Sequence, residues 1–375
     1  MVTAQANSMR IVCDRAALVD ALAMASGVVA SRTPAPVLLC VKLVAKDGTL
    51  SLHTTDTEIG LVVNLASVEV SHDGESLVPA DKLLQIARSV DDATLTIECE
   101  RNATVVKGAR ARFRVLGYDP KEFPGLRDSD LPVEFEIGAG QLRKMINRTV
   151  FATAVDNSRF AFNGVLLERR ARKIRMVATD GRRMALAKGD CGGPADGDSS
   201  CIVPTKALNV LNRLLDDPDA AVRISRERNR VVFHVGDAAV LSSSLIEGAF
   251  PPFEDVIPKE HDRRGTFDTA ELSAAVKRAA LLTNEESKGV RMSFSPERLV
   301  LSSRAPEMGD AEIELSPASW EGAAIEVGFN PGYITDMLRI ADVPEVIVEL
   351  KAPNKPGVIK FGNDFTYVLM PVNLP

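Results

Sequence analysis

The chain has no run of apolar residues close to the ~20 that a membrane-spanning helix needs, so no membrane association is expected. Its first eight residues, MVTAQANS, have neither the basic region nor the apolar core of a signal peptide. Because Met9 opens a well-patterned strand, residues 1–8 are interpreted as a flexible extension or as a misassigned start, and both Met1 and Met9 stay open as the first residue. The 375 residues, 45% hydrophobic and 26% charged, otherwise have the composition of a soluble globular protein of two to three domains.

Cysteine is scarce and scattered. The five cysteines, which show no CxxC spacing, are Cys13, Cys40, Cys99, Cys191 and Cys201. Their odd number and irregular spacing argue against a disulfide framework and against a zinc site, and they favour a reducing compartment. The predicted location is therefore the cytoplasm.

Motifs of catalysis are also missing. The sequence has neither the GxxxxGK[ST] nor the GxGxxG phosphate-binding loop, and neither HExxH nor GxSxG. The four histidines lie far apart. Three acidic residues, Asp310, Glu312 and Glu314, alternate along one strand, which predicts a solvated strand face rather than a metal site. No enzymatic activity, metal or cofactor is expected.

The chain also lacks an excess of positive charge. Its net charge is −6 and its isoelectric point is near 5.5, whereas a protein that coats nucleic acid is usually basic. Charge alone would thus argue against nucleic acid as a partner.

What the sequence does contain is one pattern repeated three times. Three amphipathic helices, AALVDALAMASGVVA, GQLRKMINRTVFATA and AELSAAVKRAALLTN, align on leucines 124 and 130 residues apart: Leu18, Leu142 and Leu272. A second helix in each repeat begins at positions 125 and 126 residues apart: Pro79, Pro204 and Asn330. Each repeat also contains half-buried strands with alternating apolar and polar residues, such as TLTIECE and EVIVELK.

This pattern predicts an α+β protein of three tandem copies of a domain with two helices and an antiparallel sheet. Polar, charged linkers place the domains at 9–132, 133–260 and 261–375, after the extension 1–8. Such domains are expected to form an arc with the sheets outside and the helices inside. The helices are more basic than the chain as a whole, which would hold a polyanion without reading its sequence, although each cation could equally be an ordinary solvated residue.

Domain size predicts how many copies would surround a duplex. A 125-residue domain is about 35 Å across, so a ring of three leaves a hole of ~5 Å and a ring of six a hole of ~35 Å. Duplex DNA, roughly 20 Å wide, passes only through the larger ring. Two chains would then pair head to tail in a closed homodimer.

Five segments resemble the bacterial DNA polymerase III beta subunit family, the sliding clamps, over essentially residues 9–374. They are FNGVLLE (162–168), VATDGRRMA (177–185), EGAFPPFEDVIP (247–258), NEESKGVR (284–291) and YVLMPVNL (367–374). The resemblance implies the DNA clamp fold, a homodimeric ring around duplex DNA, and a hydrophobic pocket for linear peptides of polymerases, clamp loader and repair factors. Carried over by motif, the pocket comprises Phe162, Thr179, Gly181, Arg182, Arg183, Met184, Pro251, Val256, Val368, Met370, Pro371 and Val372.

The chain departs from the family pattern at this pocket. Arg182 and Met184 stand where the family often has His and Leu, and arginines common in the family are Asp255 and Asn373 here. We therefore expect partner peptides that are less acidic than those of relatives.

DNA contacts and a subunit interface are implied more loosely. The DNA-contacting candidates are Arg32, Lys82, Arg148, Arg159 and Phe160, of which Phe160 could instead be a buried anchor. The candidates for the dimer interface, all of which could be ordinary core residues, are Phe113, Val115, Leu281 and Leu282.

Two functions follow. The first is a processivity clamp whose partners are sequence-independent duplex DNA, a second copy of the chain, the catalytic subunit of DNA polymerase III, an ATP-driven clamp loader, and other polymerases and repair proteins with linear motifs. The second is a peptide-binding scaffold of the same fold that no longer encircles DNA. The acidic isoelectric point, Asp255 and Asn373 keep this alternative open.

Overall fold

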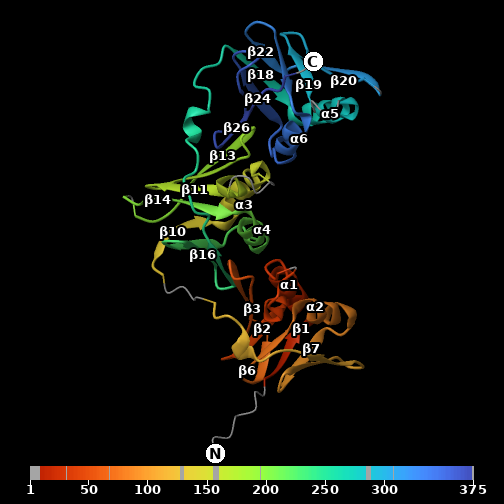
Figure 1. Ribbon diagram of the computed structural model, residues 1–375, viewed down its shortest axis with the longest axis vertical. Coiled ribbons are helices and arrows are strands. Elements are labelled where there is room, and N and C mark those ends of the chain that lie inside the picture. The colour runs from red at the N-terminus through yellow and green to blue at the C-terminus, as the bar shows by residue number, and fades with distance from the viewer. Residues whose placement is uncertain are drawn as a thin grey trace, which may run out of the picture. The chain divides into compact units, whose positions relative to one another are not determined.

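The computed structural model of the protein (Figure 1) describes residues 9–30, 32–66, 68–126, 131–154, 160–194, 196–283, 289–306 and 308–373. The chain forms two compact units. Unit 1 consists of Met1–Leu142, Gly192–Pro194 and Lys206–Leu245, and unit 2 consists of Arg143–Cys191, Ala195–Thr205 and Ile246–Pro375. The middle repeat thus contributes to both units, and each unit is described by itself.

Two α-helices occur in each repeat, as the periodicity predicts. They are α1 (Arg15–Ala25), α2 (Ala80–Ser89), α3 (Ala139–Asn147), α4 (Thr205–Leu214), α5 (Thr269–Ala279) and α6 (Pro331–Arg339). The side chains of Asp14 and Asp268 cap α1 and α5 by accepting hydrogen bonds from backbone N–H groups of the first turn. No helix of the described segments is long and apolar enough to cross a membrane.

Unit 1 contains two antiparallel sheets. The first has the order β5-β1-β7-β8-β9 and the second the order β10-β15-β16-β17-β4-β3-β2-β6. The strands are β1 (Arg10–Asp14), β2 (Cys40–Lys46), β3 (Thr49–Thr55), β4 (Ile59–Leu65), β5 (Val68–His72), β6 (Gly74–Pro79), β7 (Thr94–Glu100), β8 (Ala103–Lys107), β9 (Arg112–Leu116), β10 (Val133–Gly138), β15 (Ala221–Glu227), β16 (Arg230–Val235) and β17 (Ala239–Ser244). Helix α1 packs on α2 and on β3 and β4, which buries its apolar face.

Unit 2 also contains two antiparallel sheets, of orders β14-β11-β12-β13-β26-β25-β24-β18-β22 and β21-β20-β19-β23. Their strands are β11 (Gly164–Arg170), β12 (Lys173–Thr179), β13 (Arg183–Asp190), β14 (Asp198–Pro204), β18 (Arg263–Asp268), β19 (Val290–Phe294), β20 (Leu299–Ala305), β21 (Gly309–Leu315), β22 (Ser319–Glu321), β23 (Ile325–Phe329), β24 (Glu345–Leu350), β25 (Gly357–Phe361) and β26 (Phe365–Leu369). Helices α5 and α6 pack on each other, and α5 also packs on β20 and β21.

Strand pairing joins one repeat to the next inside each unit. In unit 1, β4 of the first repeat pairs with β17 of the second, with Leu61 opposite Leu241. In unit 2, β13 of the second repeat pairs with β26 of the third, with Ala185 opposite Tyr367. One sheet in each unit therefore continues across a boundary between repeats, a feature that the alternating patterns did not predict.

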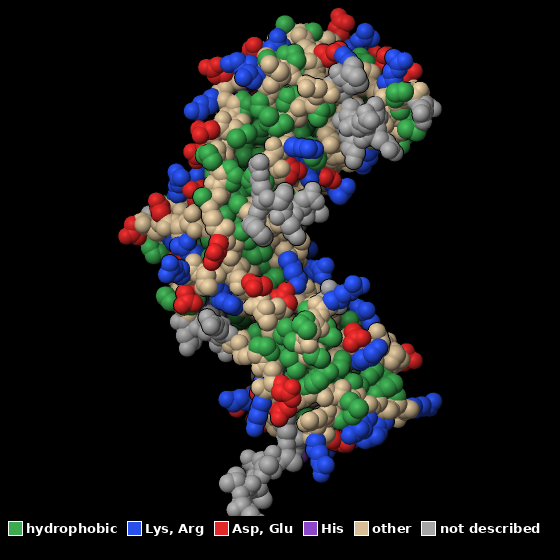
Figure 2. Space-filling model, in the orientation of Figure 1, with side chains coloured by type: hydrophobic (Ala, Val, Ile, Leu, Met, Phe, Trp, Pro, Cys, Tyr) green, Lys and Arg blue, Asp and Glu red, His purple; other side chains and the backbone are tan. Residues whose placement is uncertain are grey.

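Charged side chains of both signs lie side by side on the face of the protein shown in Figure 2. Figure 2 shows Lys and Arg side chains next to Asp and Glu side chains over the described parts of both units.

Candidate functional site

The candidate site is built around a tight turn between β12 and β13. The Thr179 hydroxyl donates a 2.7 Å hydrogen bond to the Arg183 carbonyl oxygen and accepts one of 3.1 Å from the Gly181 N–H. The Asp180 carboxylate accepts hydrogen bonds from the N–H groups of Arg182 and Arg183 at 2.9 and 3.0 Å. Gly181 adopts φ +86°, which a residue without a Cβ adopts readily. These hydrogen bonds fix the backbone of the turn.

An apolar cavity opens beside this turn. It encloses about 480 Å³ of space when its open mouth is counted. The residues that line it are Phe162, Thr179, Gly181, Arg182, Arg183, Met184, Pro251, Phe253, Val256, Val368 and Met370. The structure thus brings together ten of the twelve residues that the resemblance placed in the pocket.

Three differences from the sequence-based set concern the walls of the cavity. Pro371 and Val372 do not line it, although they directly follow Met370. Phe253, which was not predicted, does line it and is 8% exposed. It is the second aromatic residue of the quoted FPPF motif, so the sequence held a signal that could have identified it.

The floor of the cavity belongs to a hydrophobic cluster that includes Met184, Phe253 and Val368, all at most 8% exposed. Val256 and Met370, in contrast, are 44% and 39% exposed. Exposed apolar groups beside a hollow are typical of a binding surface, and methionine adapts to partners of different shape. The cavity can accept apolar side chains of a ligand without a rearrangement of the core.

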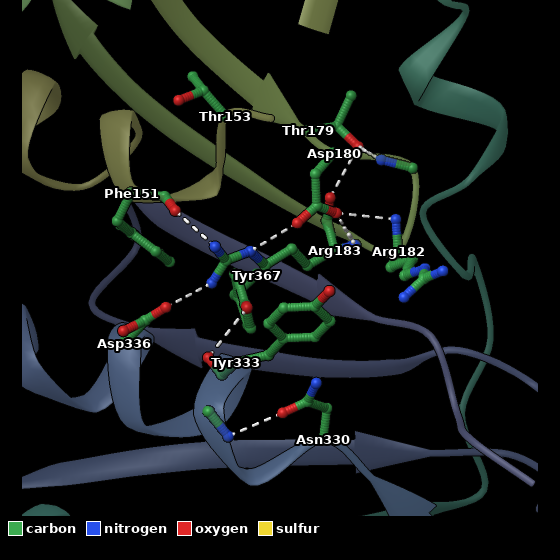
Figure 3. A network of polar contacts seen from close by, with 12 residues as sticks. Phe151, Thr153, Thr179, Asp180, Arg182, Arg183, Asn330, Tyr333, Asp336 and Tyr367 are labelled. Atoms are coloured by element: carbon green, nitrogen blue, oxygen red, sulfur yellow. Dashed lines mark hydrogen bonds and ion pairs between the residues drawn. The ribbon is translucent and has the colours of Figure 1, made fainter. Parts of the chain in front are cut away.

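Arg183 is held inside the protein by a polar network (Figure 3). Its guanidinium donates hydrogen bonds to Asp180 (3.0 Å), to Asp336 (2.8 Å) and to the Phe151 carbonyl oxygen (2.7 Å), and it lies over the ring of Tyr333 at 4.5 Å. Burial would by itself lower the pKa of Arg183, but the carboxylate of Asp336 and the other partners leave this pKa above its ordinary value. All of these groups hold the arginine as a structural cation.

Tyr367 completes the network from β26. Burial raises the pKa of its phenol well above the ordinary range, so the hydroxyl stays neutral and donates a 3.0 Å hydrogen bond to the Tyr333 carbonyl oxygen. The network thereby links the turn after β12 to helix α6, two elements from different repeats.

Arg182 behaves differently from its neighbour. It is exposed, and within the part of the chain that the structure describes, its guanidinium makes no hydrogen bond or ion pair. Its backbone carbonyl accepts the N–H of Met370 at 2.9 Å, and Figure 3 shows its side chain directed away from the network. The sequence could not separate these two adjacent arginines.

Two acidic residues lie in the chain between Phe253 and Val256 of the lining. Glu254 is tied to Arg175 by a 2.7 Å hydrogen bond, and this partner lowers the pKa of Glu254 below its ordinary value. Asp255 precedes Val256 of the lining and is exposed, with no ion pair in the described segments. Asn373 is exposed as well.

The prediction that Arg148 contacts DNA is wrong, because its side chain is only 4% exposed. It donates to Asp342 at 2.6 Å and to Asp364 at 2.8 Å, and it lies 4.8 Å from the ring centre of Phe361. Burial alone would raise the pKa of Asp342, but Arg148 and Lys144 keep it below its ordinary value. Helical spacing showed that Arg148 follows an amphipathic helix and gave no information on which neighbours would bury it.

The other DNA candidates have mixed outcomes. Arg32 and Lys82 are exposed, and Lys82 lies 3.6 Å from Asp81. Arg159 lies outside the described residues. Phe160 begins a short 3-10 helix, Phe160–Asn163, but its side chain also lies outside what the structure describes. For Arg32, Lys82, Arg159 and Phe160 the DNA contact stays a prediction.

The interface candidates lie at sheet edges or beside them. Phe113 and Val115 are half-buried on β9, an edge strand of its sheet, whereas Leu116 on the same strand is 68% exposed. Leu281 and Leu282 lie in the 3-10 helix that follows α5, and Leu281 is 76% exposed. Leu116 was not predicted, and its β-strand pattern alone gave no reason to prefer it.

Comparison with known proteins identifies the family. The N-terminal, central and C-terminal domain models of the DNA polymerase III beta subunit match residues 9–127, 136–252 and 254–373. The beta sliding clamps of Pseudomonas putida and Escherichia coli K12 are 34% and 32% identical, over 98% of this chain and 100% of each relative.

Solved structures agree with this assignment. A sliding clamp from Pseudomonas aeruginosa bound to griselimycin has a TM-score of 0.92 at 33% identity, with coverage of 98% of this chain and 100% of that one. The clamp of Bacillus subtilis has a TM-score of 0.92 at 26% identity with the same coverage. Three tandem clamp domains with a pocket at a junction define the class of this protein. The chain belongs to the DNA polymerase III beta subunit family, the bacterial beta sliding clamps.

Proposed function

We propose that this protein is the sliding clamp of its replication machinery, in which two copies close into a ring around duplex DNA and hold the replicative polymerase through the apolar pocket. A clamp needs no catalytic group. It acts because a tether keeps the polymerase at a high effective concentration near its template. The observation that carries the proposal is the strand pairing that joins successive repeats.

The same two kinds of strand pair at both boundaries between successive repeats. The outer strand of one repeat, β4 or β13, pairs with the last strand of the next repeat, β17 or β26. The equivalent strands that stay at sheet edges are β21 of the third repeat and β9 of the first. If the rule continues, β21 of one copy pairs with β9 of a second copy, and the same contact made twice closes the ring.

The repeats also give the register of this contact. Phe113 is equivalent to Leu241 in the second repeat and to Tyr367 in the third. In each repeat, the same series of paired residues leads from the strand before the first helix to this position on the last strand. Ala311 likewise occupies the place of Leu61 and Ala185. Phe113 of one copy is therefore expected opposite Ala311 of the other.

This register places opposite charges face to face. It sets Arg112 opposite Glu312 and Arg114 opposite Asp310, and all four side chains are exposed on their strands. Cross-strand pairs of opposite charge stabilise a sheet and would orient the two copies. The acidic face of β21, which the sequence indicated to be merely solvated, thus gains a role in self-association.

Exposed helix cations in all three repeats support duplex DNA as the encircled partner. Lys82, Arg88, Arg143, Arg213, Lys277 and Arg278 are exposed. Such cations interact with the phosphate backbone without reading bases, which suits a protein that slides. A closed ring has to be opened onto DNA, so an ATP-driven clamp loader belongs to the proposal, together with the polymerase III catalytic subunit, other polymerases and repair proteins as pocket ligands. The proposed location is the cytoplasm.

Retention on DNA tests encirclement directly. Protein loaded onto a nicked circular plasmid is washed at high salt, and the bound fraction is measured before and after the DNA is linearised. We expect retention on circles and loss after linearisation, because a ring slides off a free end. If salt removes the protein equally from both forms, the alternative function, a peptide-binding scaffold of the same fold, is favoured.

A charge swap tests the proposed ring contact. Arg112→Glu combined with Arg114→Glu is expected to shift the dimer towards monomer in sedimentation analysis. Asp310→Arg combined with Glu312→Arg is expected to do the same alone and to restore the dimer in the fourfold variant. Failure of the fourfold variant to recover, with each double variant folded, would refute this register.

A further inference from the structure

We propose that Arg182 selects the ligands of the pocket, so that it prefers a linear peptide with one acidic residue next to its apolar anchor and with neutral or basic residues on the side facing Asp255. The inference rests on the proposed function of the pocket and adds its charge specificity. It goes beyond the expectation, drawn from Asp255 and Asn373, that ligands are simply less acidic.

Only one of the two adjacent arginines is available to pair with a carboxylate of a ligand. Arg183 is bound by Asp180, Asp336 and the Phe151 carbonyl oxygen, so a peptide carboxylate would have to displace three partners to reach it. The guanidinium of Arg182 has no such partner in the described segments, although the residue lines the same cavity. A carboxylate that enters the mouth therefore gains its ion pair from Arg182 alone.

The backbone of Arg182 is already ordered before a ligand binds. Its N–H is held by Asp180 at 2.9 Å, and its carbonyl oxygen by the N–H of Met370 at 2.9 Å. Only side-chain rotamers have to be fixed when a ligand binds, which keeps the entropic cost of the ion pair low. The planar guanidinium can also bind a carboxylate with two parallel hydrogen bonds.

A negative charge lies next to Val256 of the lining. Asp255 precedes Val256 of the lining and has no cation partner among the described residues, while Glu254 beside it is neutralised by Arg175. An acidic residue near Asp255 is repelled, and a basic one is attracted. Most of the lining is apolar, so the charge of Arg182 and the charge next to Val256 would set the direction in which an apolar anchor enters.

Fluorescence anisotropy with designed peptides tests this specificity. The probes are fluorescein-labelled peptides of about twelve residues, with a Leu-Leu-Phe anchor between Gly-Ser spacers and with Asp, Asn or Lys directly before or after the anchor. For the full-length protein we expect the better Asp probe to bind about fivefold more tightly than its Asn counterpart at low salt, the upper end for an exposed ion pair. This preference should shrink as salt screens the pair.

Variants locate the preference. Arg182→Gln should remove the difference between the Asp and Asn probes, whereas Arg182→Lys should retain most of it. Arg172→Gln, an equally exposed arginine in the turn before β12, is the matched control and should change nothing. Arg182→His should show the preference only as the pH falls through the ordinary imidazole pKa of ~6.5.

The outcomes separate the inference from the proposed function. If Asp and Asn probes bind the parent protein equally and Arg182→Gln has no effect, the specificity is refuted while the pocket stands. Val256→Asp places a charge in the apolar lining and should weaken every probe. If no probe binds the parent protein at all, the peptide-binding role of the cavity fails, and the inference fails with it.

Discussion

Two junctions between successive repeats share one backbone plan and differ in their side chains. In both, a Thr-Asp turn leads into the joining strand. The threonine hydroxyl donates to a carbonyl oxygen four residues later, at 2.8 Å for Thr55 and 2.7 Å for Thr179, and the carboxylates of Asp56 and Asp180 each accept two backbone N–H groups. The repeat therefore preserves the turn and the ladder even where few side chains match.

The space next to the turn is used differently at the two junctions among the described residues. At the second junction, Met184 and Phe253 line the pocket. The position equivalent to Met184 at the first junction is Gly60, where a Cβ would lie 2.8 Å from Leu126 Cδ2 and 2.8 Å from Ser242 Oγ. At the first junction, the Leu126 side chain thus fills the space that corresponds to part of the pocket at the second junction. A binding pocket and a packed junction arise from the same fold through the size of a few side chains.

Charge is also used differently at the two junctions. At the first, Asp56 pairs with the half-exposed Lys206. At the second, Arg148 and Arg183 are 4% and 10% exposed and each is shared between two carboxylates. Buried cations with several partners are geometrically demanding, so the second junction is expected to depend more on individual residues.

The largest effect should follow from Arg148→Met. It leaves Asp342 and Asp364 without their buried partner, and because these carboxylates are 51% and 42% exposed, we expect a loss of about 2–3 kcal/mol, between the costs for exposed and for fully buried pairs. Urea unfolding measures it. Lys206→Met at the first junction should cost less than about 1 kcal/mol. Equal losses would contradict the contrast between the junctions.

A second test introduces at the first junction the side chain that the second junction has at the equivalent position. Gly60→Met should destabilise the protein by about 2 kcal/mol, because the new side chain collides with Leu126 and Ser242. The double variant Gly60→Met, Leu126→Ala should recover much of this loss in thermal unfolding. If Gly60→Met alone is neutral, Leu126 does not occupy the place of the pocket as described.

A third test compares the two turns. Thr57 has φ +81° and its counterpart Gly181 has φ +86°, a region that suits glycine. Gly181→Ala should therefore cost about 1 kcal/mol, whereas Thr57→Gly should be neutral or stabilising because released strain offsets the greater chain entropy. Paired chemical denaturation of the two variants measures the difference, and a destabilised Thr57→Gly would show that the first turn is not strained.

The smallest effect concerns pH. The pKa of Asp342 is held below its ordinary value in the folded state, so its contribution to stability is present above the ordinary carboxyl pKa and is lost as the pH falls through the lowered one. The stability advantage of the parent protein over Arg148→Met should narrow as the pH falls below about 4. If the difference in stability between the parent protein and Arg148→Met is the same at neutral and acidic pH, the ion pair between Arg148 and Asp342 does not cause this difference.

Much of the architecture could be predicted because it is local. Periods of two and of 3.6 residues gave the strands and the helix pairs, and the spacing of Leu18, Leu142 and Leu272 gave the three repeats. Most of the pocket followed from quoted motifs. Phe253 was missed even though its motif was quoted, and Leu116 because a strand pattern does not show which side of an edge stays uncovered.

By itself, the sequence determined the three α+β repeats and the family, since both depend on patterns between near neighbours and on motif order. Only the tertiary structure decided which arginine side chains are buried in ion pairs and which are exposed to solvent. Arg148 lies in a hydrophobic and acidic environment formed by residues some 190 or more positions away, and Arg182 and Arg183 differ only in what the fold places around them. Burial and ion pairing depend on contacts between distant segments, which no local pattern of residues encodes.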